Sequence, residues 1–96
     1  MAEKQLQAKI LRWLRQQGCY AIKTQPGAGT PVGCPDIIAL YEGAWIAIEV
    51  KATPQAKYQP LQKETLDKLS KWSPFVYTVD PELWPDIQRL LLAQFF

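Results

Sequence analysis

The sequence predicts a single α/β domain, residues 1–96, with the element order αβββαβα. Three observations carry this prediction: apolar residues recur at helical spacing near the start, middle and end of the chain, short strand-like runs lie between them, and glycine or proline marks most boundaries. The composition is 48% hydrophobic and 21% charged, as in a globular domain. The net charge of +2 gives no overall attraction to nucleic acid, so such binding would need local basic patches.

The first third of the chain predicts a helix, a strand and a loop. Apolar side chains recur at helical spacing over residues 3–17, and Gly18 provides the helix stop. A short strand is expected at residues 19–24. Residues 25–33 contain three glycines and two prolines, so we expect a loop there.

The middle of the chain predicts a β-hairpin. Strands are expected at residues 36–41 and 44–52, joined by Glu42 and Gly43 as a two-residue turn. Residues 53–59 read as a second loop.

The last third predicts a helix, a strand and a final helix. Pro60 is expected to open the second helix, which carries apolar residues on one side. A fourth strand is expected at residues 74–79. Asp80, Pro81 and Glu82 then resemble the start of the last helix.

The residue inventory narrows the possible chemistry. The chain has no histidine, which excludes serine–histidine triads, histidine-based zinc sites and imidazole catalysis. Cys19 and Cys34 form no CxxC motif and are expected to be small buried hydrophobes in a reducing cytosol. No signal peptide or membrane-length apolar run is evident, so a cytoplasmic protein without a membrane partner is expected. Any catalysis here must use carboxylates and lysine.

The predicted hairpin gathers three charges on one face. A two-residue turn pairs Asp36 with Glu49 across the strands, and Lys51 projects on the same face two residues further along. Two facing carboxylates repel each other unless a positive charge lies between them. A divalent cation would supply it, and magnesium suits a site of few carboxylates plus waters. Alternatively, Lys51 pairs with one carboxylate in a purely structural contact. A one-residue slip in register would move Asp36 to the other face.

Two more polar residues extend the candidate site. Glu3 continues the apolar stripe of the first helix, although an acid in a first helical turn also favours the helix dipole. Gln62 lies on the inward side of the second helix, where its alternative role is a hydrogen bond at the helix start.

These residues carry a family resemblance. The segments "GCPD" (33–36) and "IEVK" (48–51), with a helical glutamate before them and a helical glutamine after them, resemble the PD-(D/E)XK nuclease superfamily. More narrowly, the chain is similar to the VRR-Nuc domain in the small stand-alone form found in phages and bacteria. The resemblance implies a restriction-endonuclease-like core, with a mixed central sheet flanked by helices, and a metal-dependent DNA endonuclease.

The resemblance also implies roles for individual residues. Asp36 and Glu49 would bind Mg²⁺ or Mn²⁺, with the Val50 carbonyl as a further ligand, and Glu3 would contact the metal or a water. Lys51 would position or activate the attacking water and stabilise charge on the phosphate.

Gln62 would support the catalytic site, and basic residues would bind DNA. Lys23 matches the basic residue that usually ends the first strand of the family. The segment "ATPQAKYQPLQ" departs from the family, whose members often have a glycine-containing basic segment there, so Lys57 would supply the charge. The expected phosphate contacts are Lys4, Lys9, Arg12, Arg15, Lys23 and Lys57.

Three functions remain open on the sequence. The chain is a structure-selective endonuclease for Holliday junctions or other branched DNA, a nicking or sequence-tolerant nuclease, or a non-catalytic DNA-binding module on a nuclease fold. Paired cuts in a junction imply a homodimer. Part of the apolar C-terminal surface is expected to be left over after core packing, so it could supply the dimer interface or merely complete the core. The residues concerned are Tyr41, Trp45, Leu90, Leu91, Leu92, Phe95 and Phe96.

Overall fold

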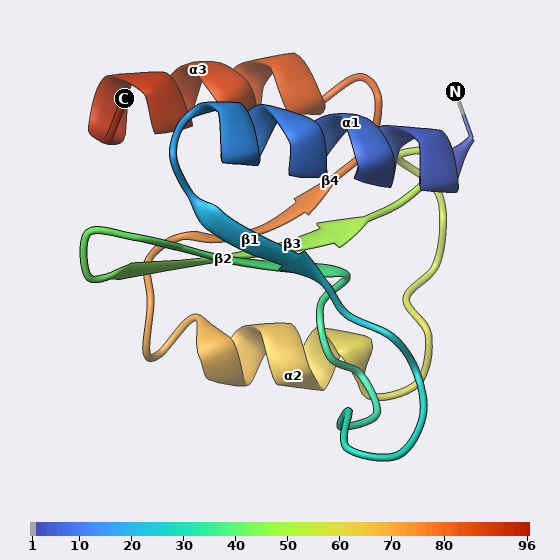
Figure 1. Cartoon of the computed structure of the whole chain (residues 1–96). Helices are drawn as coiled ribbons and strands as arrows, with labels where there is room; N and C mark the ends of the chain where they lie inside the picture. The colour runs from blue at the N-terminus through green and yellow to red at the C-terminus, as the bar shows by residue number, and fades with distance from the viewer. Residues whose placement is uncertain (1) are drawn as a thin grey trace.

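The fold has the predicted order of elements around one mixed sheet (Figure 1). A computed structural model describes residues 2–96. Its elements are α1 (Glu3–Gln16), β1 (Tyr20–Lys23), β2 (Ile37–Tyr41), β3 (Ala44–Val50), α2 (Gln62–Leu69), β4 (Val76–Val79) and α3 (Trp84–Gln94). The strands lie in the order β1-β2-β3-β4; β1, β2 and β3 pair antiparallel, and β4 pairs parallel to β3. The predicted α/β class with a mixed sheet flanked by helices is confirmed.

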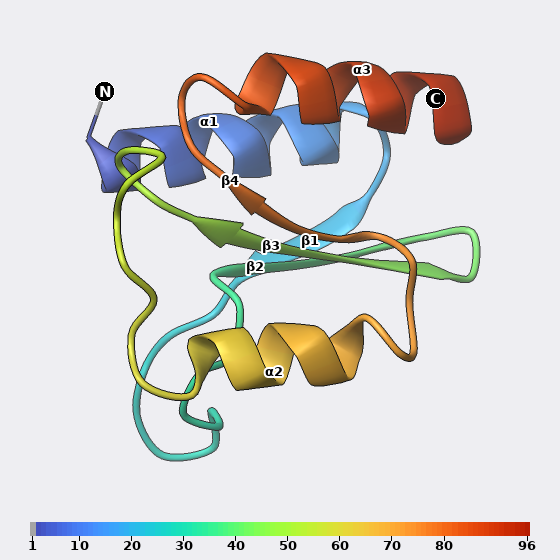
Figure 2. The same ribbon diagram turned by 180° about the vertical axis from the view of Figure 1, so that it is seen from behind.

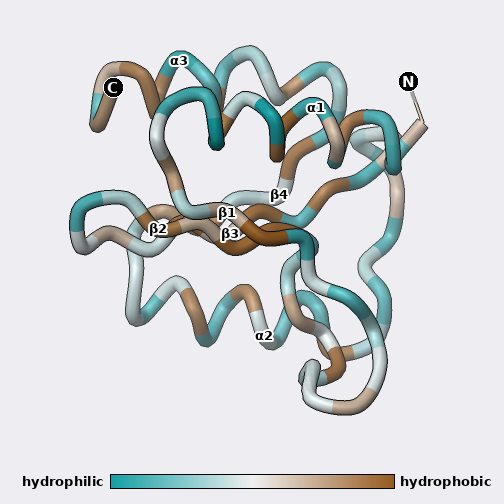
Figure 3. The backbone as a smooth tube through the Cα atoms, viewed as in Figure 1, coloured by the Kyte–Doolittle hydropathy of each residue, from teal (hydrophilic) through white to brown (hydrophobic). Residues whose placement is uncertain are grey.

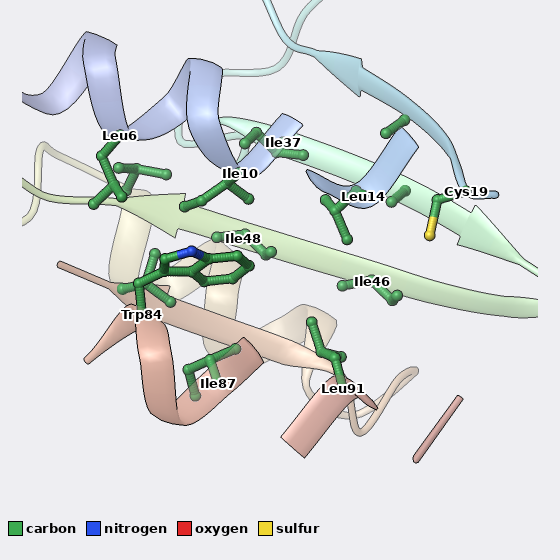
Figure 4. Close-up of a cluster of buried hydrophobic side chains, with 14 residues drawn as sticks. Leu6, Ile10, Leu14, Cys19, Ile37, Ile46, Ile48, Trp84, Ile87 and Leu91 are labelled. Carbon is green, nitrogen blue, oxygen red and sulfur yellow. The ribbon is translucent and has the colours of Figure 1, made fainter. Parts of the chain in front are cut away.

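The sheet separates two unequal layers. Helices α1 and α3 lie together on one face, and the shorter α2 lies alone on the other, as the two opposite views show (Figures 1 and 2). Apolar residues concentrate along the strands and the sheet-facing turns of the helices (Figure 3). The main core fills the space between the sheet, α1 and α3 (Figure 4), and its most deeply buried side chains include Leu6, Ile10, Leu14, Ile37, Ile46, Ile48, Val50, Val79, Trp84 and Leu91.

The β2–β3 turn has the geometry that sets the strand register. Glu42 and Gly43 both have positive φ, 46° and 84°, as a two-residue hairpin turn of the primed type requires. Tyr41 pairs with Ala44, and the same register continues for five pairs to Ile37 opposite Ile48. The predicted turn and register are therefore confirmed as far as Ile37, the residue that directly follows Asp36.

The start of α2 differs from the prediction. Pro60 does not open the regular helix, because Leu61 adopts a left-handed backbone conformation (φ 68°) that a right-handed helix cannot include. The helix begins at Gln62 instead. Only Leu66 of α2 is buried, and Trp72, which lies beyond the last helical residue, is 79% exposed.

The start of α3 follows from Asp80. Its Oδ1 accepts hydrogen bonds from the backbone N–H groups of Glu82 and Leu83, at 2.8 and 3.0 Å. This cap holds a turn that precedes the regular helix, which begins at Trp84. Pro85 then falls in the first helical turn, where a missing N–H costs nothing.

The C-terminal segment contributes partly to the core and partly to the surface, so the expectation that some of its apolar surface is left over is confirmed. Leu91 is fully buried, and Phe95 and Phe96 pack edge-on against Tyr41, with ring centroids 6.0 and 5.0 Å away. Trp13 and Phe75 extend the same aromatic cluster. Leu90 and Leu92 remain exposed.

The larger exposed apolar surface lies on the α2 side of the sheet. Tyr20 and Ile22 of β1, Trp45 of β3 and Trp72 after α2 are all exposed. We call these four residues the open face. Trp45 and Trp72 line a largely apolar hollow of about 270 Å³ where α2 stops short of the hairpin end of the sheet.

Two further sequence expectations can be compared with the described residues. Within residues 2–96, no helix has both the length and the apolarity needed to cross a membrane. Cys19 is buried, whereas Cys34 is half-buried, and neither forms a disulfide. Burial raises the pKa of both thiols, which agrees with the expected structural role.

Candidate functional site

Two carboxylates meet where β2 begins and β3 ends. Asp36 immediately precedes β2, and its Oδ2 accepts a 2.8 Å hydrogen bond from the backbone N–H of Val50. Glu49 is 1% exposed, and its Oε1 has no hydrogen-bond partner among residues 2–96. A buried carboxylate oxygen without a partner is costly, so the site is incomplete as a purely structural arrangement.

The pKa of Glu49 reflects its burial and the nearby Asp36 carboxylate. Burial, then repulsion from Asp36, raise the pKa of Glu49 to about 7, while the nearby ammonium of Lys51 opposes the shift. The facing carboxylates predicted from the register are thus present, and the charge of Asp36 disfavours the ionised form of Glu49. A single ammonium does not balance both.

Lys51, Gln62 and Glu49 form a closed set of contacts. The Lys51 ammonium donates a 2.8 Å hydrogen bond to Gln62 Oε1 and lies 3.3 Å from Glu49 Oε2. Gln62 Nε2 in turn donates to the same Glu49 oxygen at 2.8 Å. Gln62 Oε1 also accepts a hydrogen bond from the Gln59 N–H, 2.6 Å away, at the start of α2. Gln62 therefore makes the hydrogen bond expected near the helix start and also contacts Lys51 and Glu49, while its role in a catalytic site stays a prediction.

Gly33 lets the loop before Asp36 reach the first turn of α2. A Cβ at Gly33 would lie 2.6 Å from the Leu61 carbonyl oxygen and 2.8 Å from Thr65 Oγ1, and the glycine φ is 87°. No other residue type fits such an approach without displacement. Because Leu61 immediately precedes Gln62, this contact fixes the distance between the two halves of the site.

Thr24 supports Asp36 from the other side. Its backbone N–H donates to the Asp36 carbonyl oxygen at 2.9 Å, and its hydroxyl donates to the Pro35 carbonyl oxygen at 2.7 Å. Asp36 and Gln62 both line a cleft of about 510 Å³ beneath the loop at residues 25–33. The carboxylate therefore faces an accessible cavity that could admit a ligand.

The donor set fits a hard divalent cation. Asp36 and Glu49 provide oxygen ligands close together, and the partnerless Oε1 is one of them. A cation with few carboxylate ligands and several waters is typical of magnesium sites. Across residues 2–96, no group of three or more His, Cys, Asp or Glu side chains is close enough to hold a metal, so the candidate site has two carboxylates.

Comparison with known proteins gives the family. The model of the archaeal Holliday junction resolvase (Hjc) family matches residues 3–79, which include both carboxylates, Lys51 and Gln62. The chain belongs to the Hjc family. No curated protein is similar enough to this chain to add a second relative.

A solved structure shares the fold. Hjc from Archaeoglobus fulgidus, a Holliday junction resolvase from an archaeal hyperthermophile, is 24% identical to this chain with a TM-score of 0.52. The likeness covers 71% of this chain and 57% of that one, so it spans little more than half of the relative's length. Membership of the Hjc family confirms the PD-(D/E)XK part of the resemblance, whereas the match is to Hjc and not to the VRR-Nuc domain.

Glu3 lies at the start of α1, where it is exposed. Its Oε1 accepts a long, 3.5 Å hydrogen bond from Gln7 Nε2. Its role as a metal or water contact stays a prediction. Gln7 itself is 7% exposed, and sequence reasoning missed it because it falls beside the apolar stripe and carries no motif.

The predicted DNA-contacting residues divide between α1 and the end of the sheet that carries the site. Lys4, Lys9 and Arg12 are exposed on α1, which covers the face opposite to Gln62. Lys23 ends β1, one residue before the Thr24 contact to Asp36, and Lys57 lies in the segment that leads to Gln62. Lys23 and Lys57 are therefore at the site end of the sheet.

Arg15 has a structural contact that its predicted phosphate role did not include. Its guanidinium donates two hydrogen bonds to the carbonyl oxygen of Ala21, at 3.2 and 2.9 Å. This clamp attaches the last turn of α1 to β1.

We expect Gly33→Ala to destabilise the protein more than Gly29→Ala. Both glycines have positive φ, but a Cβ at Gly29 meets nothing within 4 Å, so only Gly33 adds a clash with Leu61. The free energy of unfolding should fall by about 3 kcal/mol for Gly33→Ala and about 1 kcal/mol for Gly29→Ala. Urea denaturation measures both; equal losses would contradict the close approach.

The raised pKa of Glu49 predicts a pH-dependent stability in metal-free buffer. Because the folded state holds this proton more tightly than the unfolded state, the contribution of Glu49 to stability is fully present below pH 4.5 and is lost as the pH rises through about 7. The loss should be on the order of 2 kcal/mol. Melting temperatures in EDTA measure it. Glu49→Gln should remove most of this slope and Glu64→Gln, on the exposed side of α2, should keep it; an unchanged slope in Glu49→Gln would refute the assignment.

Proposed function

We propose that this protein is a metal-dependent DNA endonuclease that hydrolyses phosphodiester bonds in four-way junctions. The observation that carries the proposal is the pair of facing carboxylates, Asp36 and Glu49, beside the buried Lys51 ammonium. Membership of the Hjc family supports junction DNA as the substrate.

The carboxylates of Asp36 and Glu49 would hold Mg²⁺ or Mn²⁺, and the carbonyl of Val50, between Glu49 and Lys51, is proposed as a third ligand. Such a cation makes water a stronger acid and offsets the negative charge that develops on the phosphate. Its binding would also remove the repulsion that raises the pKa of Glu49.

Lys51 supplies the second positive charge at the phosphate. Its ammonium offers three donors as a compact point charge, which can contact a phosphate oxygen and the attacking water. Gln62 orients this group through Oε1, and it orients Glu49 through Nε2. The amide thus keeps the lysine and a carboxylate ligand in a fixed relation.

DNA binding is proposed to involve exposed basic side chains on phosphates. Lys23 and Lys57 flank the site and would position the cut strand, while Lys4, Lys9 and Arg12 on α1 would contact a more distant part of a branched substrate. Such contacts release counterions, so affinity should fall with salt. Kinship with the VRR-Nuc domain rests on the "GCPD" and "IEVK" spacing and stays a proposal within the superfamily.

The active form is proposed to be a homodimer, because one chain holds one site and a junction is resolved by two symmetric cuts. The open face supports this more than the C-terminal tail, since Trp45 and Trp72 present large exposed apolar surface, whereas Phe95 and Phe96 of the tail are half-buried against the core. A monomer would instead be a nicking nuclease.

Cleavage should require a divalent cation and depend on the three charges. Purified protein with Mg²⁺ or Mn²⁺ should cut a labelled four-way junction in preference to linear duplex, and excess EDTA should stop it. Asp36→Asn and Glu49→Gln should each lower the rate by at least about a thousandfold, and Lys51→Ala by about a hundredfold or more, with junction binding retained.

Matched controls separate chemistry from folding. Glu64→Gln and Lys68→Ala change the same kinds of charge on the exposed side of α2 and should cut normally. Metal binding by calorimetry should persist in Lys51→Ala. Full activity in EDTA would exclude the metal mechanism, and tight binding without cleavage in any metal would favour a DNA-binding module.

Charges on the open face should break the dimer. Trp45→Glu and Trp72→Glu should convert a particle of twice the 11.0 kDa chain mass into a monomer, measured by light scattering, and paired cuts into single nicks. Leu90→Glu and Leu92→Glu place the same charge on the exposed side of α3 and should leave the dimer intact. Dissociation by the α3 variants alone would move the interface to the C-terminal helix.

A further inference from the structure

An aromatic ring encloses Lys51 on a side that the polar residues of the site leave open. Tyr58 lies in the segment at residues 52–61, which we call the strap, between β3 and α2. The Lys51 ammonium is 5.2 Å from the centroid of the Tyr58 ring, within the range of a cation–π interaction. Tyr58 Oη and Thr78 Oγ1 share a hydrogen bond of 3.0 Å.

The anchor of the ring is next to the site itself. Thr78 on β4 is the ladder partner of Glu49 on β3, so the two share a face of the sheet. The strap therefore crosses the end of this face and is tied to it at Thr78. The Lys51 side chain, although it carries a charge, is only 9% exposed. Its ammonium contacts Glu49, Gln62 and the Tyr58 ring.

The interactions of the Lys51 ammonium would change when a divalent cation binds to Glu49. Without a cation, Glu49 attracts the Lys51 ammonium across 3.3 Å. Once Glu49 serves as a ligand, its charge is shared with the cation and that attraction weakens. A lysine on a flexible four-carbon stem then turns outward unless other groups hold it. Gln62 Oε1 and the Tyr58 ring are the two contacts that remain.

We propose that Tyr58 is a positioning residue that keeps the Lys51 ammonium at the reacting phosphate, with Thr78 as the anchor of its ring. This inference rests on the proposed function and adds a residue to the same site. The strap lacks the glycine-containing basic segment that the resemblance to VRR-Nuc domains leads one to expect, and it places an aromatic ring there. Lys63 of α2 also lies 5.8 Å from the ring centroid, which adds positive charge at the strap.

The decisive comparison is between Tyr58→Phe and Tyr58→Leu, which differ in the presence of a ring. Single-turnover cleavage of a four-way junction in Mg²⁺ should slow about tenfold for Tyr58→Leu and stay within about threefold of wild type for Tyr58→Phe. Junction affinity and melting temperature should be similar in the two variants. A loss of affinity with an unchanged cleavage rate would mean that Tyr58 contacts DNA, and equal rates in the two variants would overturn the proposal.

Thr78→Val tests the anchor without touching the ring. It should slow cleavage by a few-fold in the wild-type background and have no further effect in the Tyr58→Phe background, because the hydrogen bond is already lost there. Additive effects of the two changes would show that Thr78 acts by another route and would overturn its role as anchor.

A readout independent of cleavage separates this inference from the proposed function. Amine acylation followed by mass spectrometry, in metal-free buffer, reports how well Lys51 is enclosed, with exposed Lys68 as the internal standard. Lys51 should react much more slowly than Lys68 in wild type and severalfold faster in Tyr58→Leu. If the wild-type protein cuts no DNA but Lys51 is acylated faster in Tyr58→Leu, the proposed function is wrong and the contact between Tyr58 and Lys51 is supported. If Lys51 is acylated equally fast in both proteins, the contact between Tyr58 and Lys51 is wrong.

Discussion

The strand register of the β2–β3 hairpin is the constraint on which the site depends. Two residues with positive φ, Glu42 and Gly43, close the turn and place Asp36 on the same face as Glu49. Successive side chains alternate between faces, so a turn one residue longer would send Asp36 into the layer occupied by α1 and α3. The core reinforces the register, because Ile46 and Ile48 are buried only when Glu49 points the other way.

The repulsion between the two neighbouring carboxylates is tolerated because the core on the other side of the sheet is apolar and closely packed. Isoleucines and leucines from α1, β2, β3 and α3 fill one side of the sheet, so the polar chemistry can be confined to one end of the other side. Gln62 is the link between these carboxylates and α2, and Gly33 sets how near α2 can come. The site is therefore assembled from segments that are far apart in the sequence. The hairpin turn, the Gln62 hydrogen bonds and the close approach at Gly33 hold these segments in place.

Sequence reasoning recovered what short-range patterns specify. The helical stripes, the hairpin turn and the alternation of β3 predicted the order of elements and brought Asp36, Glu49, Lys51 and Gln62 together. It failed at the start of α2: Leu61 has a left-handed backbone and lies where a Cβ at Gly33 would clash, and nothing in the local sequence indicates either feature. It also overlooked Tyr58, because an isolated aromatic residue in a loop has no periodicity to reveal its partner.

The sequence did not say how exposed apolar surface divides between the tail and the open face, for a related reason. Hydrophobicity predicts that a residue prefers burial, but it does not say how much of the sheet a helix will cover. Phe95 and Phe96 find an aromatic cluster around Tyr41, while α2 is too short to cover Trp45. The apolar surface that stays exposed depends on how all the helices pack on the sheet, and not on any one segment of the sequence.

The clamp of Arg15 on β1 has a consequence for how two chains can meet. β1 is an edge strand, and in an antiparallel pair every second residue turns its backbone N–H and C=O away from the neighbour. The Thr24 bond to Asp36 implies that Ala21 is such a residue, and its carbonyl is taken by the Arg15 guanidinium. A short edge with an occupied acceptor is a poor template for adding a foreign strand. Sheet continuation between copies is thereby discouraged at the β1 edge, which is consistent with the proposal that a dimer would form through the open face.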